Sequence, residues 1–301
     1  MIIKSCGQIC KSFYALGNLA TPVYLLDGPE PVLFDAGFTG LAHVYVDAIR
    51  GVLGSRPPAW LFLTHSHFDH VGAASVFKQT WPQMKIAGSS RCREILSNPK
   101  AIKSISRLNQ ESLALFTPSE IPVLNRDPFK PVLFDRNISD GEIVSLACGT
   151  AIEVLNTPGH TWDFMSYWLL DKRVLIASEA VGCCENDTFI QPEFLVSFDV
   201  YLESLRSLAS LDPQVLCAGH HAVFTDLNAL EHIQASIEAA HAYRILVEQF
   251  LEKEKGHIGR VTALVKKAHW DPLPWPKQPE TPYLINTRQR VKVIWERMTL
   301  K

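Results

Sequence analysis

The chain has 301 residues, of which 47% are hydrophobic and 20% are charged, so it can bury a substantial core in one large domain, or in one domain with a helical appendage. Its formal net charge is -2, which gives no electrostatic attraction to nucleic acid or to an anionic membrane, and we expect neither as a partner. No apolar run reaches the roughly 20 residues that a membrane-spanning helix needs. The N-terminus also lacks the apolar core of an export signal, so we expect a cytoplasmic protein.

The first third of the chain alternates short apolar runs with turn residues, which is typical of strands connected by turns and helices. Strands are predicted at 21–26, 32–34, 60–63 and 85–87, and helices at about 41–53 and 71–80. The strand at 60–63 leads directly into a segment rich in histidine, and Asp35 ends the strand at 32–34.

The middle and the end of the chain differ in pattern. Residues from about 89 to 118 are charged and helix-prone, with a break at Pro99. Strands are then predicted at 132–134, 142–146, 151–155, 165–170, 174–177 and 215–216, and helices at about 227–254, 258–268 and 284–298. We therefore predict a mixed α/β (α+β) fold, with a catalytic domain at 1–225 and a helical C-terminal extension at 226–301.

The segment from Thr64 to His70 contains three histidines and one aspartate directly after a buried strand. Imidazole suits zinc, iron and manganese, and carboxylate suits the harder cations, so this is a mixed nitrogen and oxygen ligand set. On a loop at the end of a strand, His65 and His67 can turn to one side while Asp69 and His70 face another. This arrangement predicts two neighbouring metal ions, since a solvated polar loop would not explain such a concentration of ligand types.

Further candidate ligands follow later strands. His160 lies in Thr-Pro-Gly-His-Thr after the strand at 151–155, Glu179 follows the strand at 174–177, and His220 follows the strand at 215–216. Asp35 is well suited to hold a ligand imidazole in orientation from behind.

The ordered series Phe-Asp-Ala-Gly, Thr-His-Ser-His-Phe-Asp-His, Thr-Pro-Gly-His-Thr, a carboxylate after a strand, and Gly-His resembles the metallo-β-lactamase superfamily over roughly residues 20 to 225. The resemblance implies an αββα sandwich with the metals at one edge. It also implies that His65, His67 and His160 hold the first metal, that Asp69, His70 and His220 hold the second, and that an acidic residue bridges the two.

Length and tail resemble two branches of this family. One is the glyoxalase II group, which hydrolyses thioesters of glutathione, and the other is a thioesterase-like quinolone-signal response branch. In both branches, C-terminal helices cap the metal site, so the resemblance implies a cap here.

The sequence leaves two assignments in the metal site open. The bridging residue of the family is usually Asp, whereas this chain has Glu179, whose extra methylene moves the carboxylate by roughly 1–1.5 Å. Glu179 can therefore bridge both metals, bind one, or bind neither. The family pattern places a ligand directly after Gly219, which favours His220 over His221 and leaves His221 to line the pocket.

Two adjacent divalent ions hold a water and lower its pKa to about 7, so the predicted nucleophile is a hydroxide bound by a dinuclear centre. Asp69 and His70 are the predicted catalytic residues, with Asp69 acting as ligand and as acceptor of the water's proton. A thiolate leaving group, with a thiol pKa of about 8.5, needs little protonation.

We therefore predict a metal-dependent hydrolase of acyl thioesters or related small esters. A lactone or phosphodiester hydrolase and a regulatory or binding protein that retains the metal site are the alternatives. The expected cofactors are two divalent ions, zinc first, with iron or manganese open. The expected partner is a small-molecule substrate, and a homodimer is left open.

Overall fold

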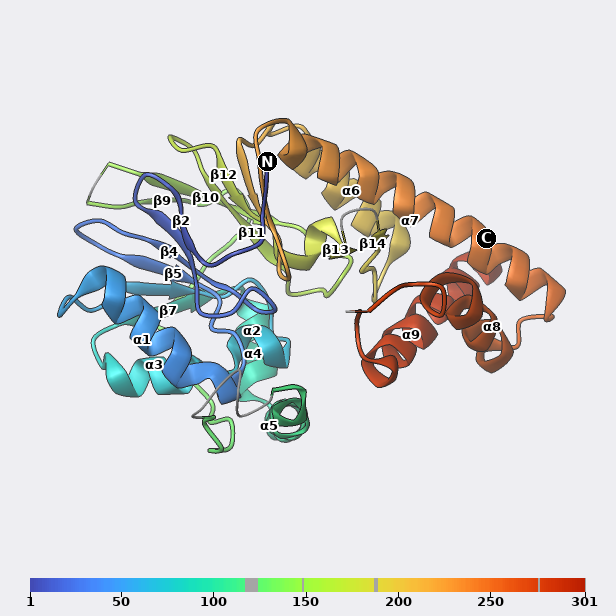
Figure 1. Ribbon diagram of the computed structural model, residues 1–301, viewed down its shortest axis with the longest axis horizontal. Coiled ribbons are helices and arrows are strands. Elements are labelled where there is room, and N and C mark those ends of the chain that lie inside the picture. Colours follow the sequence, from blue (N-terminus) through green and yellow to red (C-terminus); the bar gives the residue numbers. More distant parts are fainter. Residues whose placement is uncertain (117–123, 148, 187–188, 276, 301) are drawn as a thin grey trace.

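The computed structural model describes residues 1–116, 124–147, 149–186, 189–275 and 277–300. Two seven-stranded sheets lie face to face, and helices cover their outer faces (Figure 1). The predicted αββα arrangement is therefore confirmed.

The first sheet has the strand order β2-β3-β4-β5-β6-β7-β8. Its strands are β2 (Gly7–Cys10), β3 (Phe13–Leu16), β4 (Val23–Leu26), β5 (Val32–Phe34), β6 (Trp60–Phe62), β7 (Lys85–Gly88) and β8 (Arg136–Asn137). The strands from β5 to β8 run parallel to one another, so their carboxyl ends meet at one edge of the sheet. Parallel neighbours need crossover connections, and these contain η1 (Thr39–Leu41), α1 (Ala42–Leu53) and α3 (Ala74–Thr80).

The second sheet has the order β1-β16-β15-β12-β11-β10-β9. Its strands are β1 (Ile2–Ile3), β9 (Ile143–Ser145), β10 (Ala151–Asn156), β11 (Met165–Leu169), β12 (Val174–Ile176), β15 (Val215–Cys217) and β16 (Val223–Thr225). Both β10 and β12 are antiparallel to β11, and β15 is parallel to β12. Strands β10, β12 and β15 therefore run in the same direction and end at the same edge.

Large side chains fill the space between the sheets. The ring centroids of Phe34 and Phe62 each lie 5.4 Å from that of Tyr167, and all three side chains are fully buried. Two tyrosines also cross the sandwich with hydrogen bonds: Tyr167 donates to the carbonyl of Leu63 at 2.6 Å, and Tyr24 donates to the carbonyl of Ala218 at 2.6 Å. These bonds fix the segments that follow β6 and β15, where the candidate ligands lie.

Helices α4 (Ser90–Ser97) and α5 (Pro99–Ser112), followed by the short turn η2 (Leu113–Leu115), occupy the predicted helix-prone segment. The predicted break at Pro99 is confirmed, because the Asn98 side chain caps α5 by accepting from the amide of Lys100 at 2.9 Å. The end of the helix-prone segment near residue 118 lies outside the described residues.

Two sequence-based predictions were wrong in detail. The predicted helix at 71–80 is two helices, α2 (Phe68–Val71) and α3, and the histidine motif therefore runs from an extended segment into α2 instead of staying on a loop. The predicted strand at 132–134 is not a strand. Val132 and Phe134 are buried in the apolar cluster of the first sheet and its helices. The apolar residues at 132–134 therefore indicate a buried irregular segment before β8, not a strand.

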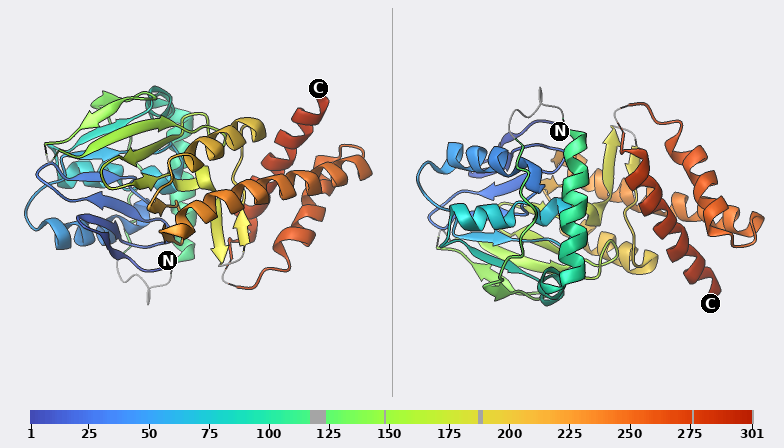
Figure 2. Two further views of the ribbon diagram at one scale, coloured as in Figure 1. Left: turned by 90° about the horizontal axis from the view of Figure 1, so that it is seen from above. Right: turned by 90° about the horizontal axis from the view of Figure 1, so that it is seen from below.

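The second sheet is covered by the remaining elements. They are η3 (Ser178–Val181), β13 (Cys183–Asn186), β14 (Phe189–Gln191), α6 (Phe198–Ala209), α7 (Leu227–Lys253), α8 (Ile258–Val265), the π-helical turn η4 (Lys266–Trp270) and α9 (Glu280–Thr299). Both views of Figure 2 place the β13–β14 hairpin beside α7 and α9.

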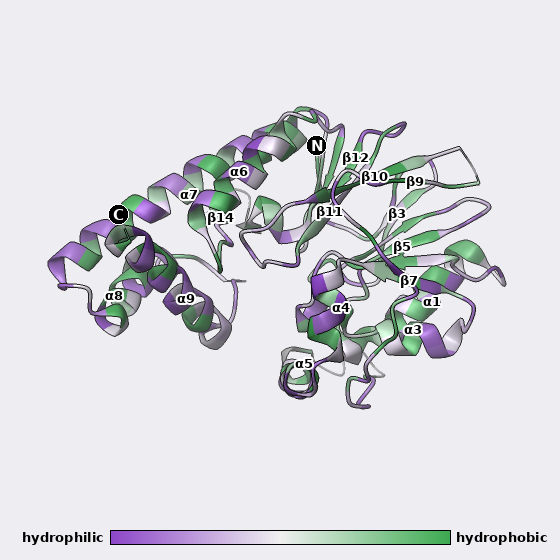
Figure 3. Ribbon diagram, turned by 180° about the vertical axis from the view of Figure 1, so that it is seen from behind, coloured by the Kyte–Doolittle hydropathy of each residue, from purple (hydrophilic) through white to green (hydrophobic). Residues whose placement is uncertain are grey.

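Helix α7 carries the tail away from the sandwich, with α8 and α9 beyond it (Figure 1). Apolar side chains of α7 and α9 join the cluster that packs on the second sheet, among them Ile233, Val247 and Ile294. The strands and the inner faces of these helices are hydrophobic, whereas polar residues gather on the outer faces (Figure 3). Within the described parts of the chain, no helix combines the length and the apolar character needed to cross a membrane.

Candidate metal centre

Candidate ligands from both sheets lie at the same edge of the sandwich. His65 and His67 follow β6, and Asp69 and His70 follow them on α2. From the second sheet, His160 follows β10, Glu179 lies in η3 after β12, and His220 follows β15. The parallel direction of these strands explains the arrangement, because each ligand lies just beyond the carboxyl end of its strand.

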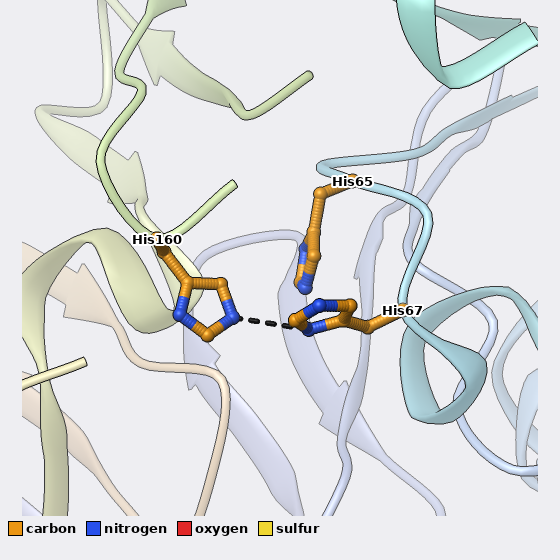
Figure 4. Close-up of side chains that lie close together, drawn as sticks. All are labelled: His65, His67 and His160. Carbon is orange, nitrogen blue, oxygen red and sulfur yellow. Dashed lines mark hydrogen bonds between the residues drawn. The ribbon is translucent and has the colours of Figure 1, made fainter. Parts of the chain in front are cut away.

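The first group consists of His65, His67 and His160, whose nearest ring nitrogens all lie within 4.8 Å of one another. The three rings turn toward a common point (Figure 4), with the Nε2 atom of His160 3.0 Å from the Nδ1 atom of His67. The Nε2 atom of His65 is buried and has no hydrogen-bond partner among the described residues. Three converging imidazoles with one buried nitrogen left over are what a metal ion would satisfy.

The second group consists of Asp69, His70, Glu179 and His220, again with ligand atoms within 4.8 Å of one another. The Nε2 atom of His70 lies 2.7 Å from Oε1 of Glu179, and the Nε2 atom of His220 lies 3.0 Å from the same oxygen. The Oδ2 atom of Asp69 is 3.8 Å from Nε2 of His70 and 3.7 Å from Nε2 of His220. The two groups therefore differ in chemistry, since the first holds imidazoles only and the second adds two carboxylates.

Glu179 lies between the two groups. Its Oε1 atom, which contacts the second group, is 4.0 Å from the Nε2 atom of His65 in the first group. Its Oε2 atom accepts a short hydrogen bond from the Ser178 hydroxyl. A Cβ atom at Gly219 would lie 2.9 Å from Oε2, so the absence of a side chain there leaves room for the longer carboxylate. Ser178 and Gly219 thus turn Oε1 toward the histidines.

The two candidate ligand imidazoles of the second group are also held from behind. Asp35, at the end of β5, accepts from the amide of Thr64 at 2.8 Å and lies 3.0 Å from Nδ1 of His70. The backbone carbonyl of Ala20 accepts a short hydrogen bond from Nδ1 of His220. Such contacts fix a proton on Nδ1 and turn Nε2 toward the other side chains of the group.

The loop that carries His160 depends on a glycine. Gly159 has φ = +129°, and a Cβ atom there would lie 2.4 Å from the Cα atom of Tyr201 on α6. Only glycine allows this approach of two backbones. The carbonyl of Glu193 then accepts from Nδ1 of His160 at 2.6 Å, which sets the orientation of the ring.

Burial and charge act differently on the two groups. Burial lowers the pKa of His65 well below its ordinary value and lowers the pKa of His160 to about 3, so both stay neutral, which is the form that binds metal. Burial also opposes the charged form of His220, but the hydrogen bond to Glu179 and the negative charges of Glu179 and Asp69 together outweigh burial and raise the pKa to about 9. Burial would raise the pKa of Glu179, yet His70 and His65 lower it well below its usual range.

All seven predicted ligands lie in these two groups, and Asp35 lies behind His70. His221 lies beside the centre instead of in it: it is exposed, its backbone has φ = 65°, and its ring centroid is 6.0 Å from that of His220. No sequence pattern pointed to Glu193, Ser178 or Asp163, the last of which accepts from the amide of Ser66 at 2.9 Å. Glu193 and Asp163 lie outside the helices and strands, Ser178 begins η3, and all three reach the centre only through the fold.

The model of the metallo-beta-lactamase superfamily matches residues 16–220. The chain belongs to this superfamily. A probable metallo-hydrolase, YflN of Bacillus subtilis, is 28% identical over 242 residues, which are 73% of this chain and 88% of that protein. Among solved structures, the superfamily protein ST1585 of Sulfolobus tokodaii has a TM-score of 0.59 at 16% identity and covers 97% of this chain and 100% of its own, which shows a shared fold.

Two other curated relatives of this superfamily member carry the names of specific activities. The atrochrysone carboxyl ACP thioesterase of Aspergillus fumigatus is 21% identical over 252 residues, 82% of this chain and 66% of that protein. The hydroxyacylglutathione hydrolase of Nitrobacter hamburgensis is 27% identical over 127 residues, 41% of this chain and 35% of that protein. The chain thus spans only about a third of the latter relative.

Membership of the metallo-beta-lactamase superfamily makes the chain a hydrolase of a family that binds divalent metal ions, and the described residues include two groups placed for that purpose.

Proposed function

We propose that this chain is a metal-dependent hydrolase of acyl thioesters or related small esters, with two divalent ions held by the two groups. The observation that carries the proposal is the position of Glu179, whose Oε1 atom is 2.7 Å from His70 in one group and 4.0 Å from His65 in the other. One carboxylate oxygen within reach of both groups supports two neighbouring sites that would each hold an ion.

Divalent ions held in this way supply a water of lowered pKa and polarise the scissile carbonyl oxygen. In the proposal, His65, His67 and His160 hold one ion and Asp69, His70 and His220 hold the other. The side chain of Asp69 is 15% exposed, so its carboxylate can face the substrate and accept the proton of the attacking water. His70 is held by Asp35 behind it and lies 3.8 Å from Oδ2 of Asp69, where it would bind the same ion.

The choice of thioester rests on the leaving group. A thiolate, from a thiol of pKa about 8.5, departs without a proton donor, whereas an amide nitrogen or an alkoxide needs one. In the proposal the imidazoles of both groups bind the ions, so none of them is left free to protonate a leaving group. The names of the two relatives that act on acyl-carrier and glutathione substrates are consistent with this choice.

The proposal is tested with purified protein whose metal content is measured and which is then given a panel of small substrates: a glutathione thioester, an acyl coenzyme A, a lactone, an oxygen ester and an aryl phosphodiester. We expect close to two ions per chain and the highest kcat/KM on a thioester. We also expect Asp69→Asn to lower kcat by about a hundredfold or more, whereas replacement of the exposed His43 on α1 leaves kcat unchanged.

Two results would contradict the proposal. Preference for the phosphodiester would assign the other hydrolytic branch. Two bound ions without turnover of any substrate would assign a binding or regulatory role.

A further inference from the structure

A fully buried arginine lies in the C-terminal helices. Arg290 on α9 is 0% exposed and has the largest volume among the fully buried side chains of the described residues. A guanidinium remains charged in proteins and is costly to bury unless its donors are satisfied. The hydrogen-bond partners of Arg290 therefore indicate which segment of the chain it stabilises.

The donors of Arg290 converge on the three residues that end the β13–β14 hairpin. The Nη1 atom donates to the carbonyl of Pro192 at 3.0 Å and to Oε1 of Glu193 at 3.1 Å. With the Gln191 amide flipped to the orientation that satisfies both its oxygen and its nitrogen, the oxygen accepts from Nη2 at 2.9 Å. The remaining donors reach the Tyr243 hydroxyl on α7 at 3.3 Å and the Thr287 hydroxyl at 3.2 Å.

Glu193 connects this arginine to the candidate metal centre. Its backbone carbonyl accepts from Nδ1 of His160 at 2.6 Å, and its carboxylate Oε2 atom lies 4.0 Å from the same nitrogen. Both side chains are buried, with Glu193 and His160 each 3% exposed. Arg290 therefore binds the side chain of Glu193 and the backbone carbonyl of Pro192, while the backbone carbonyl of Glu193 orients His160.

We propose that Arg290 is a positioning residue for the first metal site and acts through Glu193 on His160. The inference rests on the proposed function in one respect, that the first group binds a metal ion. The guanidinium fixes the 191–193 segment, this segment holds the proton of His160 on Nδ1, and the Nε2 atom is thereby aimed at the other two histidines. The C-terminal helices thus take part in forming the metal site.

The experiment compares metal binding by the full-length wild type, Arg290→Met, Arg290→Lys and Glu193→Gln. Zinc affinity is measured by competition with a chromophoric chelator, and the geometry of each site is measured from the visible absorption spectrum after cobalt substitution. Loss of a contact that orients a ligand typically lowers metal affinity by about 10- to 100-fold. We expect a loss of this size for one ion only in Arg290→Met, a smaller loss in Arg290→Lys and Glu193→Gln, and a changed cobalt spectrum for that ion.

Arg297 provides a matched control on the same helix. It lies seven residues further along α9 and forms an ion pair with Asp199 at 2.9 Å and another with Glu248 at 3.4 Å, without reaching the 191–193 segment. Arg297→Met should lose ion pairs of the same kind and keep both zinc affinities and the cobalt spectrum.

The outcomes separate the two proposals. A wild type that binds no metal would overturn the proposed function. A wild type that binds two ions, together with folded Arg290→Lys and Glu193→Gln variants that bind both as tightly, would overturn the role of Arg290 alone. If Arg290→Met does not fold, the two variants of conserved volume decide the question.

Discussion

At the scale of single residues, Glu179 shows how a chain can use a longer carboxylate at a position where the family usually has Asp. Ser178 holds Oε2, Gly219 leaves space beside it, and Oε1 reaches the histidines of both groups. Ser178 and Gly219 therefore accommodate the extra methylene of Glu179.

The match predicts that Glu179→Asp weakens metal binding. The shorter side chain withdraws the carboxylate by roughly 1–1.5 Å, which breaks the 2.7 Å and 3.0 Å contacts of Oε1 with His70 and His220. We expect the affinity for at least one ion to fall by about tenfold or more, measured by chelator competition. The exposed Glu203 on α6 provides the control, because Glu203→Asp leaves both affinities unchanged. If Glu179→Asp bound metal more tightly than the wild type, the surroundings of residue 179 would not be adapted to the longer side chain.

The candidate ligands could be predicted from the sequence because they are metal-binding side chains in short motifs that follow apolar strands. His65, His160 and His220 all have this signal. The residues that orient them do not. Glu193 reaches His160 with a backbone carbonyl, which any residue type can supply, and Arg290 reaches Glu193 from nearly a hundred positions away. Such roles depend on the packing of distant segments, which periodicity does not report.

At the scale of elements, β4 and β12 were predicted because they are buried apolar runs bounded by turn residues, whereas the similarly buried β3 was missed. The strands β2 and β13 were missed because they are short and lack an apolar run. Helix α6 also lacked a prediction, although Leu202, Leu205 and Leu208 give it a helical stripe. The error at 132–134 has the opposite cause, since buried apolar side chains there occur without strand pairing.

Helix α7 is attached to the second sheet through a buried histidine. The His232 ring stacks on Phe224 of β16 with centroids 4.0 Å apart, and its Nε2 atom donates to the carbonyl of Val181 at 3.0 Å. Burial lowers the pKa of His232 to about 4, although the hydrogen bond to Val181 opposes the shift. The neutral ring is thus the form that docks the helix.

This shift predicts a loss of stability in acid. The pKa of about 4 in the folded state lies below the unfolded value of 6.5, so the unfolded chain takes up the proton first. The contribution of neutral His232 to the free energy of unfolding is complete above pH 6.5. As the pH falls toward 4, up to about 3 kcal/mol of this contribution is lost. Urea unfolding of metal-free protein should show the stability gap between wild type and His232→Gln narrowing over this range.

Ser236→Ala is the matched control for the acid measurement. The Ser236 hydroxyl donates to the same carbonyl of Val181 at 2.7 Å and does not titrate. Its loss should lower stability equally at both ends of the pH range. A gap between wild type and His232→Gln that is constant with pH would contradict the prediction.

At the scale of the whole molecule, the division into a catalytic domain at 1–225 and a helical extension at 226–301 remains a prediction. The apolar cluster on the second sheet includes Leu216 and Phe224 from one side of this boundary and Ile233, Val247 and Ile294 from the other. Arg290 adds a polar connection across the same boundary. We therefore expect the extension and the sandwich to unfold together in one cooperative transition.

Hydrogen exchange measured by mass spectrometry at increasing urea concentrations can check this expectation. Peptides from α7 and α9 should lose protection at the same urea concentration as peptides from β11 and β12, because they share one cluster. Earlier loss of protection in the helices would instead show an appendage that opens alone.

The centre draws its ligands from two layers: four side chains come from the first sheet and three from the second. An ion bound there would therefore fasten the layers together along one rim, where apolar packing ends. At a hundredfold excess over its dissociation constant, each such ion would add about 2.7 kcal/mol to the folded state. A cell short of that ion would therefore lose stability as well as turnover, and the loss would be concentrated along this rim.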